Sequence, residues 1–478
     1  MKITLFELKT ALPHWQFEHV TDTQLKSITF ESINHDSRAV DPGGKELFIV
    51  VDGPKFDPHD FIDSAFENGA VVAICEDKKR AKVKSKKPLI LVQDSKRALS
   101  ELTQFVREKI KVPVVAITGS TGKSMTREMM ACIFREKGTV LCADVGANIN
   151  TLWGNVEVLM KFSNEDYVVL EVGVDTVGEI QWQMEALTPD IGCIINIGEV
   201  HSGPLGGVKN LVAEKKDMAV LLGKTGKPVV LNVDDERTVG FIKVLEGEMV
   251  TVSAKKSADI RASDVSVDQK GTHFSLSFGK SGKPMTVDLR VYGEGYVYNA
   301  LCASAMANTL GVDKGSIRKG LEKCEGFPYR FEKIQVAPNI TLINDAYNAN
   351  PQSMRMSIKT FLKLWGGEKY YKIVILGDML ELGEVSKQAH EDLGQRLKDT
   401  EFDEVYYIGE NYKYVTVGDL LESREEVKET IERILKAFTD TTWNVVVLIK
   451  ASNGLALYTI PAEMGFETLH SYRNSLLH

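Results

Sequence analysis

Short apolar runs separated by amphipathic stretches dominate the first part of the chain. The runs at 47–51, 71–75 and 89–92 are rich in Val, Ile and Leu, and a helix-like stretch covers 60–68. Apolar runs of this length, bounded by polar turns, are typical of strands buried on both faces of a parallel sheet. The pattern therefore predicts a small α/β domain over residues 1–110.

The same alternation returns after residue 110, with one interruption. Buried strands are expected at 114–118, 167–172, 191–197, 229–233, 340–343, 372–376, 404–408 and 445–449. Between 249 and 291 apolar and polar residues alternate with period two, which predicts a small antiparallel addition. The fold class is therefore α/β, with a central doubly wound, mostly parallel sheet over 111–327 and a Rossmann-like domain over 328–478.

The size and charge of the chain narrow the function classes. A chain of 478 residues exceeds what one hydrophobic core supports, in agreement with three domains. The net charge of -8 argues against nucleic acid as a partner and favours small-molecule substrates. No apolar run approaches the roughly 20 residues that span a bilayer, and the first residues lack a secretory signal, so a cytoplasmic protein is expected. Six separated cysteines without a C-x-x-C pair predict reduced thiols.

A glycine-containing loop follows the expected strand at 114–118. It consists of Gly119, Ser120, Thr121, Gly122, Lys123 and Ser124. Backbone N–H groups of such a loop can surround phosphate oxygens, a lysine reaches the outer phosphates, and a serine hydroxyl can bind Mg²⁺. Counted from Ala116, the spacing is A-x-x-x-x-G-K-S. The loop and the helix expected after it indicate a nucleoside triphosphate site.

Three further positions carry candidate ligands. Two lie at the ends of expected strands, where open α/β sheets place their ligands, and the third lies in the helical stretch that follows. Glu171 ends the strand expected at 167–172, and His201 follows the strand at 191–197. Both could share a divalent cation, although an idle exposed carboxylate and a structural histidine are the simpler interpretations when each residue is taken alone. Lys215 and Asp217 lie in a helical stretch whose charges could also simply face solvent.

The order of these segments resembles that of the Mur ligases. The phosphate loop is followed by the Asn-containing segment 146–151, by Leu-Glu-Val-Gly at 170–173, by His201, and by Lys215 with Asp217. Segments 344–354 and 376–383 resemble the members that add D-alanyl-D-alanine, and segments 35–38 and 56–61 resemble their nucleotide-sugar-peptide-binding domain. The resemblance covers nearly the whole chain in order.

The resemblance implies an ATP-dependent amide ligase that joins D-alanyl-D-alanine to UDP-N-acetylmuramoyl-tripeptide through an acyl phosphate, as a monomer. Lys123, Glu171, His201 and Lys215 would be catalytic. Two Mg²⁺ ions are implied, one at Ser124 and one held by Glu171, His201 and a carbamylated Lys215. With the phosphate loop, the ATP-binding residues would be Asn299, Arg330 and Asp345. The substrate residues would be Asp36, Ser37, Arg38, Asn148, Asn150, Tyr347 and Asn348.

The chain departs from the usual family pattern at four places. Gly-Glu-Gly-Tyr at 293–296 replaces Gly-x-His-Asn, Lys-Ala-Ser-Asn at 450–453 replaces Lys-Gly-Ser-Arg, Tyr329 replaces a glycine, and Asp217 replaces a glutamate. These changes bear on substrate contacts more than on the phosphate chemistry. They leave three alternatives: a relative with another acceptor, such as a folate or poly-amino-acid ligase; a non-catalytic nucleotide-binding scaffold; and a phosphate-loop NTPase with other coupling.

Overall fold

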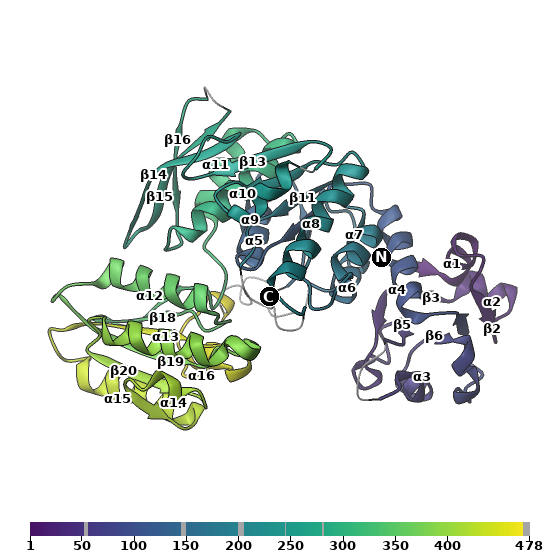
Figure 1. Ribbon diagram of the computed structural model, residues 1–478. Coiled ribbons are helices and arrows are strands. Elements are labelled where there is room, and N and C mark those ends of the chain that lie inside the picture. Colours follow the sequence, from purple (N-terminus) through teal and green to yellow (C-terminus); the bar gives the residue numbers. More distant parts are fainter. Residues whose placement is uncertain (52–55, 145–149, 199–204, 244, 280–281, 472–478) are drawn as a thin grey trace. The chain divides into compact units, whose positions relative to one another are not determined.

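The computed structural model describes the chain except residues 52–55, 145–149, 199–204, 244, 280–281 and 472–478. The chain forms two compact units. Figure 1 draws the chain with its helices and strands labelled. Residues 1–116, 138–174 and 178–191 make the first unit, and residues 117–137, 175–177 and 192–478 make the second. No helix among the described residues is long and apolar enough to cross a bilayer. All six cysteines are free thiols.

The first unit contains the small α/β sheet that the apolar runs predict. Its strands are β2 (Gln16–Glu18), β4 (Ser32–Asn34), β5 (Glu46–Ile49), β6 (Val72–Glu76) and β7 (Leu89–Val92). They have the order β2-β7-β6-β5-β4, in which β4 to β7 are parallel and β2 is antiparallel to β7. Phe48 and Ala73 of the sheet pack in one cluster with Phe66 of the helix α3 (Ile62–Glu67). The expected strands β5, β6 and β7 and the α/β fold of this region are confirmed.

The first unit holds several further short elements. These are β1 (Ile3–Thr4), paired with β3 (Thr29–Phe30); the helices α1 (Leu5–Ala11), α2 (Asp22–Ser27), α4 (Ser95–Lys109), α6 (Leu152–Met160) and α7 (Glu179–Leu187); and the 3₁₀ turns η1 (Ser37–Ala39), η2 (Pro58–Phe61) and η3 (Asp77–Lys82). The single helix expected over 60–68 is divided, because the 3₁₀ turn η2 precedes the helix α3.

A nine-stranded sheet has the order β16-β15-β14-β13-β12-β11-β8-β10-β9. Its strands are β8 (Val114–Thr118), β9 (Val140–Cys142), β10 (Tyr167–Glu171), β11 (Ile191–Ile194), β12 (Val229–Asn232), β13 (Met249–Ser253), β14 (Ile260–Asp268), β15 (Gly271–Phe278) and β16 (Met285–Leu289). β9 and β10 pair in parallel, and so do successive neighbours from β11 through β14. β15 is antiparallel to both of its neighbours, β14 and β16. The strand order reverses at β8, and in open α/β sheets such a reversal is where ligands bind.

Two sequence-based boundaries in this sheet are wrong. The antiparallel addition begins at β14 rather than at residue 249, because β13 pairs in parallel with both β12 and β14. The strand expected at 191–197 ends at Ile194. The next residues leave the ladder because the Asn196 carbonyl accepts a hydrogen bond from the Ser120 N–H at 3.1 Å.

A six-stranded sheet near the C-terminus has the order β17-β18-β22-β19-β20-β21. The strands are β17 (Glu332–Ala337), β18 (Ile340–Asn344), β19 (Tyr370–Gly377), β20 (Glu404–Ile408), β21 (Asp419–Leu421) and β22 (Asn444–Lys450). All neighbours are parallel except β17 and β18. The Rossmann-like expectation for this part of the chain is therefore confirmed.

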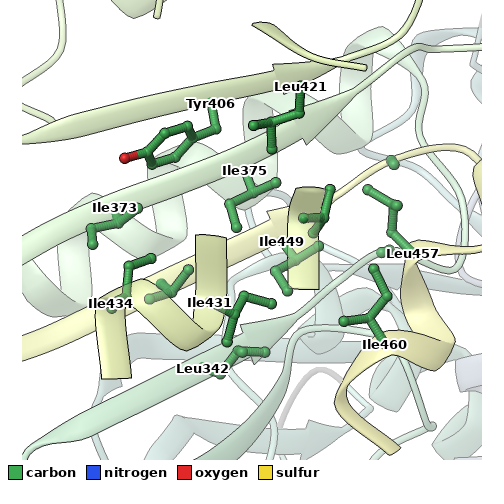
Figure 2. Packing of buried hydrophobic residues seen from close by; sticks show 14 of the residues in the cluster. Leu342, Ile373, Ile375, Tyr406, Leu421, Ile431, Ile434, Ile449, Leu457 and Ile460 are labelled. Carbon is green, nitrogen blue, oxygen red and sulfur yellow. The ribbon is translucent and has the colours of Figure 1, made fainter. Parts of the chain in front are cut away.

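Both faces of this sheet are covered, which explains its nearly continuous apolar strands. Ile373 and Ile375 of β19 pack with Ile431 of α15 (Arg424–Phe438) on one face (Figure 2). Val374 and Leu376 pack on the other face with residues of α12 (Pro351–Trp365) and α13 (Ser386–Lys398). The second unit contains the helices α5 (Lys123–Arg135), α8 (Val208–Lys224), α9 (Glu236–Ile242), α10 (Gly295–Thr309), α11 (Lys314–Lys323), α12 (Pro351–Trp365), α13 (Ser386–Lys398), α14 (Tyr412–Val415), α15 (Arg424–Phe438) and α16 (Ile460–Glu463). Its 3₁₀ turns are η4 (Gly383–Val385), η5 (Asn453–Leu455) and η6 (Leu457–Thr459).

Candidate active site

The phosphate loop joins β8 to α5 in a fixed backbone conformation. Asn196 fastens its first part, because its Oδ1 accepts from the Thr121 N–H at 3.0 Å and its Nδ2 donates to the Thr121 carbonyl at 3.0 Å. Gly122 precedes α5 with φ +87°, a conformation that favours glycine. A Cβ atom there would also lie 2.6 Å from Asn299 Nδ2. Two asparagines from distant segments therefore hold the loop.

Asn299 and Lys123 both contact the loop backbone. Asn299, on α10, donates from Nδ2 to the Gly122 carbonyl at 2.7 Å. Lys123 donates from Nζ to the Gly119 carbonyl at 2.8 Å. This loop can receive phosphate oxygens at the N-terminal end of the 13-residue helix α5, where the helix dipole favours an anion.

Lys215 lies on α8 with only 2% of its surface exposed. Its Nζ donates to Thr118 Oγ1 at 3.1 Å. Burial lowers the pKa of the Lys215 ammonium well below its usual value, the positive charge of Lys123 lowers it further, and Glu214 offsets part of the effect. A solvent-facing charged helix is therefore the wrong interpretation for this position. Burial thus favours the neutral amine form of Lys215 over the charged form.

Glu171 is also buried, at the C-terminal end of β10 in the first unit. Its surface is 4% exposed, so the interpretation as an idle exposed carboxylate is wrong. Asn155 holds the backbone here, since its Nδ2 donates to the Glu171 carbonyl at 2.8 Å. Asn150 lies nearby: its carbonyl accepts from the Gly173 N–H at 2.6 Å. The other two sequence-predicted residues of this group, His201 and Asn148, lie outside the described residues.

A cavity of about 630 Å³ opens beside the phosphate loop within the second unit. Thr121, Gly122, Ser124 and Asn299 line it, as do Arg330 and Asp345. It is large enough for a small-molecule ligand or cofactor, and its polar groups come from several elements. The cavity thus brings together six of the residues that the sequence marks as nucleotide contacts. Tyr347 and Asn348 follow Asp345 directly in the chain.

A buried ion pair holds Asp345 in place. Lys450 Nζ donates to Asp345 Oδ2 at 2.8 Å and to the Asn348 carbonyl at 3.1 Å. The other carboxylate oxygen, Oδ1, accepts from the Phe331 N–H at 3.1 Å. Burial lowers the pKa of Lys450, and the Asp345 carboxylate opposes that shift. The sequence shows Lys450 only as the first residue of an altered family motif, and its partner is 105 positions away.

Arg330 is presented by an unusual backbone. Tyr329 and Phe331 on either side of it have φ values of +65° and +52°. Left-handed conformations of non-glycine residues cost about 1–2 kcal/mol each and persist where packing enforces them. The Tyr329 ring packs on Tyr458 at 4.9 Å. The Arg330 guanidinium lies over the Tyr347 ring, 4.4 Å from its centre. The tyrosine that replaces the family glycine thus keeps the glycine-like turn.

The sequence-predicted substrate residues Asp36, Ser37 and Arg38 form a tight turn in the first unit. Asp36 accepts from Arg38 Nε at 2.9 Å and Nη2 at 2.7 Å, and this pairing lowers the pKa of Asp36 to about 2. Ser37 is buried. The ring of the preceding residue, His35, contacts Trp153 edge to face at 4.4 Å. Trp153, which the sequence does not single out, donates to Glu157 Oε1 at 2.8 Å.

Family comparisons cover most of the chain. The description "Mur ligase family, catalytic domain" matches residues 29–107, "Mur ligase middle domain" matches 117–307, and "Mur ligase, glutamate ligase domain" matches 329–453. The UDP-N-acetylmuramoyl-tripeptide--D-alanyl-D-alanine ligase of Bacillus subtilis is 30% identical over 392 residues, covering 82% of each chain. Its Escherichia coli counterpart is 29% identical, covering 81% of this chain and 83% of the relative.

Solved structures agree with the sequence relatives. MurF from Acinetobacter baumannii has a TM-score of 0.83 at 27% identity, covering 97% of this chain and 99% of the other. MurF from Thermotoga maritima in complex with ADP has a TM-score of 0.76 at 26% identity, covering 91% and 96%. The order of motifs, the two doubly wound sheets and these relatives lead to one conclusion: the chain belongs to the Mur ligase family.

Proposed function

We propose that the protein is an ATP-dependent amide ligase that joins D-alanyl-D-alanine to UDP-N-acetylmuramoyl-tripeptide in peptidoglycan precursor synthesis. The observation that carries the proposal is the cavity that the phosphate loop shares with Arg330 and Asp345. Similarity to ligases that are named for this reaction supports the two substrates. Three family matches separated near residues 110 and 328 support domains over 1–110, 111–327 and 328–478.

ATP is the nucleotide that this cavity suits. A polyphosphate can accept hydrogen bonds from the loop N–H groups, and the Lys123 ammonium can exchange the Gly119 carbonyl for an outer phosphate oxygen. Arg330, held over Tyr347, supplies a second positive charge on the cavity wall. The related Thermotoga maritima structure in complex with ADP supports an adenine nucleotide here.

The reaction needs two bond exchanges. First, a terminal carboxylate oxygen of the tripeptide attacks the γ-phosphorus of ATP, the bond to the bridging oxygen breaks, and ADP leaves. The amine of D-alanyl-D-alanine then attacks the acyl carbon, the carbon–oxygen bond to phosphate breaks, and the amine loses a proton. Negative charge increases on the transferring phosphoryl group, so fixed cations such as Lys123 lower the barrier.

The donor set fits Mg²⁺, a hard cation that prefers oxygen ligands. Ser124 would hold one ion through its hydroxyl, and Glu171, His201 and a carbamylated Lys215 are the ligands proposed for a second. When bound, Mg²⁺ neutralises charge on the phosphate oxygens. Ser124 lines the cavity and Glu171 is a buried carboxylate, in agreement with these roles.

Carbamylation of Lys215 is part of the proposal. The neutral amine attacks CO₂, a nitrogen–carbon bond forms, and the proton leaves to solvent, so a cationic side chain becomes an anionic oxygen donor. Only an uncharged amine reacts, and burial, which lowers the pKa of Lys215, favours that form. The Thr118 hydroxyl at 3.1 Å orients the nitrogen.

The nucleotide-sugar substrate is assigned to the first unit. Asp36, Ser37, Arg38 and Asn150 are proposed to contact it there, while Tyr347 and Asn348 are proposed to contact substrate from the second unit. Since the turn at 36–38 is already formed by the Asp36–Arg38 pair, it can present Arg38 without further folding. We further propose that the enzyme acts as a monomer in the cytoplasm.

The test is phosphate release from ATP and Mg²⁺ with the purified protein. Reactions contain UDP-N-acetylmuramoyl-tripeptide with either lysine or diaminopimelate as third residue, with and without D-alanyl-D-alanine. Turnover that requires both substrates and yields the pentapeptide mass supports the proposal and identifies the third residue. ATP binding without turnover in any combination would contradict it and favour a non-catalytic scaffold.

A further inference from the structure

One face of the helix α12 forms part of the cavity wall. In the sequence this helix is far from the phosphate loop. Five residues of α12 line the cavity: Gln352, Ser353, Met356, Ser357 and Thr360. They are separated by one and three residues in turn, which places them on one face of α12. The helix is labelled in Figure 1. The altered segment 293–296, which leads into α10, lines the same cavity.

Segment 293–296 and this face of α12 are in contact. A Cβ atom on Gly295 would lie 2.4 Å from the methyl carbon of Met356, and one on Gly293 would lie 3.3 Å from Thr360 Oγ1. Met356 therefore occupies the space that a side chain at position 295 would take. The phosphates are assigned to the loop, so the base of the nucleotide must lie against another part of this wall.

Ser357 has an unexplained hydroxyl. The residue is 4% exposed, and its Oγ has no hydrogen-bond partner within the described part of the chain. Buried polar groups are rarely left in this state, because a hydroxyl that leaves water without gaining a partner destabilises the fold. The hydroxyl of Ser353, one turn earlier, already has a partner, since it accepts from the Asn350 N–H at 3.0 Å.

Ser357 is also singled out among similar groups. Four serine and threonine hydroxyls of the described residues are buried without a partner: those of Ser120, Thr126, Ser304 and Ser357. Of these residues, Ser357 lines the cavity and the other three do not. Ser357 lines the cavity while its Oγ is itself covered, so a rotation of the side chain about its Cα–Cβ bond would bring to a ligand a hydroxyl that can both donate and accept.

The surroundings of this hydroxyl restrict the ligand. Met356, Tyr296 and Phe331 contribute apolar and aromatic surface to the same cavity. The Tyr296 hydroxyl donates to the Arg330 carbonyl at 3.2 Å, so its polar atom already has a partner. A flat heteroaromatic group with one polar edge suits such a wall, because its faces pack on apolar surface while its edge makes hydrogen bonds.

We propose that Ser357 is a specificity-determining residue whose Oγ hydrogen-bonds to the exocyclic amine edge of the adenine base. The inference rests on the proposed use of ATP. It assigns base recognition to α12 of the C-terminal domain, whereas phosphate binding belongs to the loop after β8. Ser357 would be satisfied when nucleotide is bound.

The experiment compares ATP with purine riboside triphosphate, which lacks the 6-amino group, as substrates and as ligands in calorimetry. In Ser357→Ala the KM and the dissociation constant for ATP are expected to rise about fivefold, the size of one neutral hydrogen bond. The values for the analogue should stay within twofold of the unaltered enzyme, and the effect on ATP should fall on KM rather than on kcat.

Ser304→Ala is the matched control, because it removes another buried hydroxyl that has no partner among the described residues and that does not line the cavity. Its affinity for ATP should be unchanged. Equal weakening of both nucleotides in Ser357→Ala, or no weakening of either, would overturn the assignment of Ser357. Failure of the unaltered protein to turn over or bind ATP would instead overturn the proposed function, so the two outcomes are distinct.

Discussion

The phosphate loop and the α12 side of the same cavity are built in different ways. The loop backbone is fastened by Asn196 and Asn299, and no side chain fits at Gly122. On the α12 side, the space beside Gly295 is filled by the flexible end of Met356. The first arrangement fixes main-chain donors for the reacting phosphates. The second depends on side chains that can be exchanged, and the chain departs from its family there.

This difference predicts that changes at the loop affect the rate and that changes near α12 affect affinity. The largest effect is expected for Lys123→Met. Losing the cation beside the transferring phosphoryl group should lower kcat about a thousandfold, as for other groups that stabilise transition-state charge. Steady-state phosphate release measures it. Lys137→Met is the control, since that lysine follows α5 and pairs with Asp313 on the surface. If the variant only raised the KM for ATP and kept its kcat, Lys123 would not act in phosphoryl transfer.

Lys215→Ala should lower the ligation rate about a hundredfold, because the proposed carbamate oxygens are lost. Acetate or propionate at millimolar concentration should restore part of the activity, whereas neither should restore Lys123→Met. The neighbouring lysine provides the control variant, Lys216→Ala, which should remain active without added carboxylate. Full activity of Lys215→Ala without rescue would rule out the carbamate.

Lys450→Met tests whether the ion pair at the cavity is structural. Removing one partner leaves the buried Asp345 carboxylate without its cation, and broken buried pairs of this kind cost about 3 kcal/mol. The thermal unfolding midpoint should fall clearly, and the KM for ATP should rise because Asp345 lines the cavity. Lys319→Met removes a surface lysine that pairs with Glu136 and should leave the midpoint nearly unchanged. An unaltered midpoint in Lys450→Met would show that the pair contributes little.

The smallest effect is expected for Gly295→Ala. The new methyl group would displace only the end of the Met356 side chain, which is flexible. The KM for ATP should therefore rise about twofold, with kcat retained. Gly122→Ala is the opposite case, because its Cβ would meet the Asn299 amide that holds the loop. If both variants lost kcat equally, the proposed contrast between the two sides would be wrong.

The apolar pattern predicted most of the buried parallel strands, and the Gly-Lys-Ser motif predicted the phosphate loop, since both depend on local sequence. Short strands such as β4, β9 and β21 were missed. The sequence could not show the partners that fix the site. Thr121 and Asn196 are 75 positions apart, and Asn299 reaches Gly122 over 177. The early end of β11 has the same origin, because Asn196 bonds to the loop instead of extending the strand. Burial of Lys215 was hidden as well, since a run of charged residues on a helix normally faces solvent.

Trapping of the acyl phosphate tests the central claim most directly. The protein is incubated with ATP, Mg²⁺ and UDP-N-acetylmuramoyl-tripeptide without D-alanyl-D-alanine, and borohydride is then added to reduce any acyl phosphate to an alcohol. We predict the mass of the terminal alcohol of the tripeptide, dependent on ATP and absent in Lys123→Met. Formation of pentapeptide in the complete reaction without any trapped alcohol in the incomplete one would contradict an acyl-phosphate route.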